Sequence, residues 1–88
     1  SRYDLARQRL QECLEIQVQL GNRRGVALAR HSLALTARYR GDHREASEQL
    51  YESLQCFRDL EDLWGIVNSL EAYAMLAVAR QQYDRAAR

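Results

Sequence analysis

The sequence predicts an all-α fold in which antiparallel helix hairpins repeat and stack as an α-solenoid. The chain matches itself when it is shifted by 40 residues, which indicates a repeating unit of that length. Within each period the apolar residues fall three or four positions apart, as on one face of a helix. With no proline and four glycines in 88 residues, the composition suits one small helix-rich domain, residues 1–88.

The self-match holds over the whole chain with one offset and no gap. Gly25 falls on Gly65, which chance alignment of leucines and alanines does not explain. The other matches are Ala6 with Ala46 and Ala86, Leu10 with Leu50, Leu14 with Leu54, Leu20 with Leu60, Ala34 with Ala74, Ala37 with Ala77, and Arg40 with Arg80.

Short breaks separate the helices in order. Gly21-Asn22 ends the first helix, and Gly41-Asp42 ends the second, where Gly41 suits the left-handed residue that closes a helix. The third helix opens with Asp42 and Glu45 at capping-box spacing, and Glu61-Asp62 separates it from the fourth. We expect helices over residues 3–20, 24–40, 43–60 and 63–81, and the start of a short fifth helix over 83–88.

Small residues should mark the places where the helices cross closely, because a methyl side chain lets two axes approach. Gly25 and Gly65 each cost a helix about 1 kcal/mol relative to alanine, so their repetition indicates a steric need, the close approach of the preceding helix. The expected crossing residues are Ala34, Ala37, Ala46, Ala74, Ala77 and Ala86, and the expected core residues are Leu33, Leu50, Leu54, Phe57, Leu60, Leu70, Tyr73 and Leu76.

The segment from Leu33 to Leu54 resembles the tetratricopeptide repeat signature, most closely at its small positions. Tyr73 to Ala86 repeats the pattern, except that Gln81-Gln82 replaces the Gly-Asp turn. The matching residues are Leu33-Ala34, Ala37, Gly41-Asp42-His43, Ala46 and Leu50. The resemblance implies a right-handed solenoid, here with a 40-residue rather than a 34-residue period.

The helix junctions Leu20–Ala27 and Leu60–Val67 are similar to those in the repeat arms of large bacterial signal-transduction ATPases and transcriptional regulators. That similarity implies a sensor or scaffold part of a larger regulatory protein. By the family pattern, 24–60 is one repeat, 3–20 is the second helix of the repeat before it, and 63–81 with 83–88 begins the next. Both ends are then expected to expose core-type surface, on which copies of the chain could stack head to tail.

The same resemblance implies that the first helix of each repeat lines a concave binding face. Leucine and methionine at two of the places where related domains grip a peptide carboxylate argue against a carboxylate clamp and favour an amphipathic helix or an extended apolar segment. Packing between helices is the competing role for these apolar positions. The candidate partner-binding residues are Leu28, His31, Leu35, Arg38, Asn68, Glu71, Met75 and Val78.

Other functions lack a sequence signal. Neither His31 nor His43 has a second metal-ligating residue at a suitable spacing, so we expect no metal site. The sequence has neither a glycine-rich loop nor a nucleophile motif, so we expect no cofactor and no enzymatic activity. A net charge of +1 argues against nucleic acid, and the absence of a long apolar run argues against a membrane span. Two cysteines without a disulfide framework fit the cytoplasm.

Three functional classes remain open from the sequence. A protein or peptide interaction module leads, because the repeat and the concave positions support it. A self-associating structural segment and a small-molecule sensor arm are the alternatives.

Overall fold

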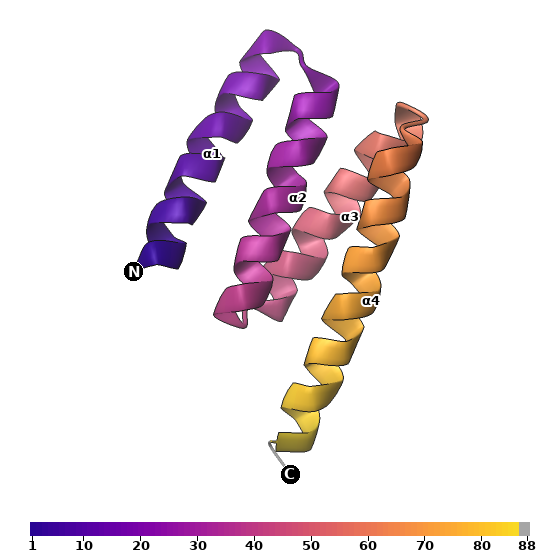
Figure 1. Ribbon diagram of the computed structural model, residues 1–88. Helices are drawn as coiled ribbons and strands as arrows, with labels where there is room; N and C mark the ends of the chain where they lie inside the picture. Colours follow the sequence, from indigo (N-terminus) through magenta and orange to yellow (C-terminus); the bar gives the residue numbers. More distant parts are fainter. Residues whose placement is uncertain (87–88) are drawn as a thin grey trace.

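The computed structural model describes residues 1–86 and contains four α-helices joined by short connections (Figure 1). They are α1 (Arg2–Leu20), α2 (Arg23–Arg40), α3 (His43–Asp59) and α4 (Leu63–Ala86). Each helix packs against the next along the chain, and α2 also contacts α4. The predicted all-α helical repeat is confirmed, and the first three helices begin and end within one residue of the expected positions.

The three connections between helices share a two-residue pattern and lie twenty residues apart along the chain. A residue with positive φ lies between each helix and the next: Gly21 (68°), Gly41 (83°) and Glu61 (52°). The next residue then accepts a backbone hydrogen bond at the start of the following helix, which satisfies an otherwise unpaired N–H group. The three bonds run from Gly25 N to Asn22 Oδ1 (3.0 Å), from Glu45 N to Asp42 Oδ1 (3.1 Å) and from Gly65 N to Asp62 Oδ1 (3.0 Å).

The expected break after residue 81 is absent, because α4 continues through Gln81 and Gln82 to Ala86. These two glutamines occupy the repeat positions of the helix-closing residue and the capping residue. Glutamine is a good helix former and lacks the short side chain of a helix cap, so nothing at this point stops the helix. The prediction of a fifth helix beginning at residue 83 was therefore wrong for 83–86, and its last two positions, 87–88, lie outside the described residues.

The hydrophobic core forms two clusters along the row of helices. The first lies between α1 and α2, where Leu14, Ala29 and Leu33 are buried and Leu10 and Val26 pack against them. The second joins α2, α3 and α4, and the three alanines expected at its crossings are buried there. Its buried members are Ala34, Ala37, Ala46, Leu50, Ala72 and Leu76.

Part of the expected core is on the surface. Leu70, Ala74, Ala77 and Ala86 are exposed on α4, because no other helix of residues 1–86 covers them. Three further expected core residues are half-buried: Leu54, Leu60 and Tyr73. Leu33, Leu50, Phe57 and Leu76 are fully buried as predicted.

Candidate functional site

The contact between α2 and α4 brings most of the predicted site residues together. The two helices lie side by side with α3 behind them (Figure 1). A cavity of about 230 Å³ opens between them, and three predicted residues from each helix line it. They are His31, Leu35 and Arg38 from α2, and Asn68, Glu71 and Met75 from α4; Tyr39 and Ala72 complete the lining.

A second cavity of about 410 Å³ adjoins the first, since Arg38 and Met75 line both. It adds the predicted residue Val78, and its wall is mainly apolar. The remaining lining residues are Ala74, Ala79 and Gln82. We call the two cavities together the α2/α4 groove.

Leu28 lies outside this groove. It is half-buried on α2 and lines neither cavity. The sequence prediction also missed residues that do line the groove. Ala79 and Gln82 continue the spacing of Met75 and Val78 by one turn, and Gln82 lies beyond residue 81, where the sequence predicts that the helix ends.

Arg38 is the charged group at the junction of the two cavities. Its guanidinium carbon lies 4.9 Å from the centre of the Tyr39 ring, a cation–π contact that holds the side chain beside the groove. The ion pairs found in residues 1–86 involve other arginines. Its positive charge therefore remains open to a ligand in the groove.

The polar side chains that line the first cavity differ in whether they have hydrogen-bond partners. The side-chain amide of Asn68 donates to the Trp64 carbonyl (2.7 Å), which turns it back onto its own helix. His31 is half-buried, and its Nδ1 atom is buried without a hydrogen-bond partner among the described residues. Desolvation by burial lowers the pKa of His31 below its ordinary value of 6.5, so the imidazole is neutral at neutral pH.

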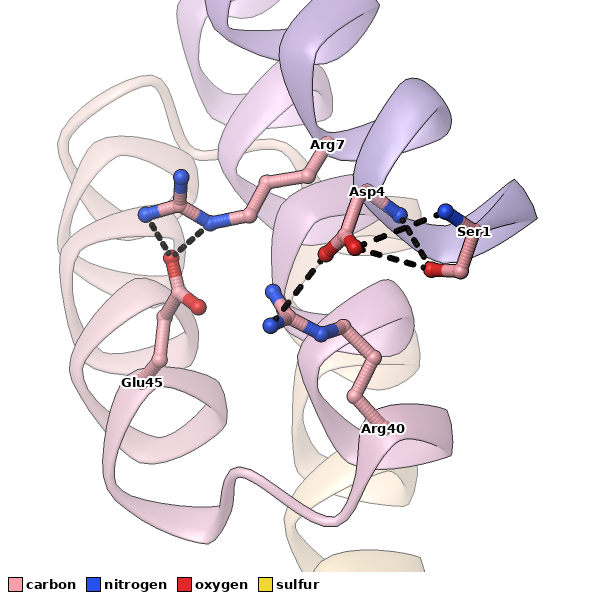
Figure 2. Close-up of polar contacts among 5 residues, drawn as sticks. All are labelled: Ser1, Asp4, Arg7, Arg40 and Glu45. Atoms are coloured by element: carbon pink, nitrogen blue, oxygen red, sulfur yellow. Dashed lines mark hydrogen bonds and ion pairs between the residues drawn. The ribbon is translucent and has the colours of Figure 1, made fainter.

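A separate polar cluster lies where α1 meets the ends of α2 and α3 (Figure 2). Arg7 reaches across from α1 to Glu45 at the start of α3, with Nη2 2.8 Å from Oε1. Arg40 at the end of α2 pairs with Asp4 of α1 at 3.3 Å. A cavity of about 460 Å³ lies among these side chains.

The charges of this cluster neutralise one another. The hydroxyl of Ser1 and the guanidinium of Arg40 lower the pKa of Asp4, and the hydrogen bond to Glu45 raises the pKa of Arg7. Glu45 was expected to complete a capping box, but its side chain pairs with Arg7 instead. The cluster connects α1 to its neighbours through the Arg7–Glu45 and Arg40–Asp4 ion pairs.

Two arginines in the first turn of α2 form ion pairs with acidic residues near the α3–α4 connection. Arg23 pairs with Asp59 (3.5 Å) and Arg24 with Asp62 (2.6 Å). Arg24 also lies over the ring of Trp64, at 5.7 Å from its centre. Each of these two arginines therefore has its own acidic partner.

The part of the chain that the structure describes holds no candidate metal site and no candidate membrane span. Over residues 1–86, no cluster of three or more histidine, cysteine or acidic side chains has the geometry to hold a metal ion. Within the same part of the chain, no helix combines the length and apolar character needed to cross a bilayer. Cys13 is exposed and Cys56 half-buried, and both are free thiols.

Comparison with known proteins identifies the repeat. A sequence model of the tetratricopeptide repeat matches residues 1–59, which is more than half of the chain. No curated protein and no solved structure matches the chain significantly. The matched segment covers α1, α2 and α3, and the 40-residue offset extends its pattern to α4. The chain belongs to the tetratricopeptide repeat family.

Proposed function

We propose that this chain binds a partner polypeptide in the α2/α4 groove. Tetratricopeptide repeats generally serve as protein-interaction modules rather than catalysts. The observation that supports the proposal most strongly is the convergence of six predicted site residues, three from each helix, on one cavity. Val78 adds a seventh in the adjoining cavity.

The chemistry of the groove favours an amphipathic helix or an extended apolar segment. Its larger cavity has an apolar wall of Met75, Val78 and alanines, which suits one aliphatic or aromatic side chain of the partner. Arg38 lines that cavity, and the ion pairs found among residues 1–86 do not involve it. A partner with an apolar anchor next to a hydrogen-bond acceptor would fit this arrangement.

The cellular setting that we propose is the cytoplasm of a bacterium, within the sensor or scaffold part of a larger regulatory protein. The similarity of the helix junctions to those of signal-transduction ATPases supports the regulatory role. Free Cys13 and Cys56 fit a reducing compartment.

The proposal is tested with peptides that bind the 88-residue chain. They are selected from a random peptide display library against the immobilised chain. Their affinity is measured by fluorescence anisotropy for the wild type, for the double variant Leu35→Glu/Met75→Glu, and for Val18→Glu as a control. Val18 is exposed on α1, away from the groove, so its variant introduces the same charge elsewhere.

We expect the double variant to weaken binding at least tenfold, a loss of about 1.4 kcal/mol or more, because a carboxylate in an apolar cavity is poorly solvated. The control should bind like the wild type. Selected peptides that bind the double variant as tightly as the wild type would contradict a groove between α2 and α4.

A further inference from the structure

One face of α4 is apolar and uncovered among the described residues. A stripe with helical spacing runs along it, and its large members are strongly exposed: Leu63 by 73%, Val67 by 53% and Leu70 by 55%. Ala74 and Ala77 continue the stripe and are also exposed. We call these five residues the α4 stripe.

The internal repeat shows what kind of surface the α4 stripe matches. Forty residues earlier, the same positions on α2 are Arg23, Ala27, Arg30, Ala34 and Ala37. The three alanines among them are no more than 1% exposed, because α3 packs on that face. A helix of the α3 type therefore covers this face within the chain. The equivalent face of α4 has leucines in place of the two arginines and Val67 in place of Ala27.

The face of α3 that covers α2 is also identified by its contacts. Ser53 Oγ donates to the Ala27 carbonyl at 2.8 Å, and Arg30 Nη1 donates to Gln49 Oε1 at 3.2 Å. Ser53 is fully buried by this contact. The α3 residues that share this face at helical spacing are Ala46, Gln49, Ser53, Cys56 and Leu60.

The equivalent face of α1 is open. Forty residues before the α3 set lie Ala6, Arg9, Cys13, Ile16 and Leu20, which we call the α1 stripe. Ile16 is 53% exposed and Leu20 is 71% exposed, whereas the matching α3 residues are half-buried. Cys13 is exposed, whereas the matching Ser53 is fully buried.

We propose that two copies of this chain associate head to tail, with the α1 stripe of one copy packed on the α4 stripe of the next. The interface continues the one between α2 and α3, with the same 40-residue register. Leu63 and Leu70 on one side and Ile16 and Leu20 on the other are removed from water by the contact. Because each copy carries both stripes, the association is heterologous and extends to chains of several copies.

The register places two named residues opposite each other. Since Ser53 contacts Ala27 inside the chain, Cys13 of one copy should contact the backbone at Val67 of the next. Within one copy these two residues cannot meet: α2 and α3 separate α1 from α4, and among the described residues α1 and α4 share no contact (Figure 1). A disulfide between positions 13 and 67 would therefore report a contact between copies.

Cross-linking of the 88-residue chain tests the proposal directly. The variant Val67→Cys/Cys56→Ser keeps Cys13 and adds one thiol on the α4 stripe; the control is Glu71→Cys/Cys56→Ser, which adds a thiol at an exposed α4 position off the stripe. After mild oxidation, a non-reducing gel should show dimers and higher multiples for the first variant. They should form about ten times faster than in the control, because association raises the local concentration of the matched thiols.

Two further variants distinguish head-to-tail packing of the α1 stripe on the α4 stripe from packing of another surface on the α4 stripe. Adding Cys13→Ser to the first variant should abolish the multiples, whereas packing of α4 on α4 would leave a dimer and overturn the proposal. Leu70→Glu should lower the mass seen by light scattering to that of a monomer while circular dichroism shows unchanged helix content, since Leu70 is exposed. A wild type that stays monomeric at millimolar concentration, or equal cross-linking of the control, would also overturn it.

Discussion

The ring of Phe57 on α3 lies directly against the backbone of Gly65 on α4, so that a Cβ atom at position 65 would overlap the ring. Phe57 is fully buried. Forty residues earlier the same relationship joins Gln17 of α1 to Gly25 of α2. The steric need expected from the repeated glycines is thus present at both helix junctions, with a rigid neighbour at one and a flexible neighbour at the other.

We expect Gly65→Ala to destabilise the protein. Displacing a buried ring costs about 1–3 kcal/mol, and the better helix propensity of alanine offsets about 1 kcal/mol of it. Urea unfolding followed by circular dichroism measures the change in the free energy of unfolding.

Gly25→Ala is the matched control. Here the new methyl group meets the far end of the Gln17 side chain and the Asn22 amide, and a side-chain end can move. We expect stability equal to the wild type or up to about 1 kcal/mol higher. Equal losses in the two variants would contradict the distinction between the rigid and the flexible neighbour.

Two buried serines should respond oppositely to alanine. Ser53→Ala removes the hydrogen bond to the Ala27 carbonyl and should lower the free energy of unfolding by about 0.5–1.5 kcal/mol. Ser69→Ala removes a buried hydroxyl that has no partner among the described residues, so stability should stay the same or rise. Thermal and urea unfolding of both variants checks this, and a loss at Ser69 as large as that at Ser53 would refute the assignment.

The glutamines at 81 and 82 are expected to be the reason that α4 continues. Gln81→Gly/Gln82→Asp restores the pair of residue types that ends α2 and caps α3, and should interrupt the helix there. Carbon-13 Cα chemical shifts measure this: those at 81 and 82 should lose their helical values. The double alanine variant should keep them, and an unbroken helix in the Gly/Asp variant would show that the glutamines do not decide the outcome.

Burial of His31 predicts a pH dependence of stability. Its pKa is lowered in the folded protein, so below the ordinary value of 6.5 the unfolded chain binds more protons than the folded chain. The contribution of His31 to stability is therefore complete above that value and is lost as the pH falls through the folded pKa.

Urea unfolding at a series of pH values from about 7.5 to about 5 compares the wild type with His31→Gln. The wild type should lose more stability than the variant as the pH falls, and the difference isolates His31 because His43 is present in both. Parallel profiles would contradict the sign of the shift.

The local rules of the sequence were sufficient for the helices and their connections. Gly21 and Gly41 take the left-handed conformation, and Asn22, Asp42 and Asp62 cap the following helices, all of which depends on residues a few positions apart. The predicted end of the fourth helix was wrong, because Gln81 and Gln82 occupy the repeat positions of a helix-ending pair but are themselves good helix formers. There the helix propensity of the actual residues outweighed the expectation carried over from the repeat.

Burial and groove lining depend on which helices are neighbours, which local spacing does not contain. Leu70 and Ala74 have the repeat positions of core residues but are exposed, because no described helix covers that side of α4. Leu28 shares a helix with His31 and Leu35 but lies beyond the cavities. The family pattern assigns the binding face to α2 and α4, and the packed structure shows where along these two helices the cavities open.

The position of a bound peptide on the chain shows whether the α2/α4 groove is the binding site. A selected peptide is titrated into the nitrogen-15-labelled 88-residue chain, and the backbone amide shifts are mapped onto the structure. The largest changes should fall on residues 31–39 of α2 and 68–82 of α4, where the residues that line the two cavities lie. Changes concentrated on α1 or α3, with these two segments unaffected, would contradict it.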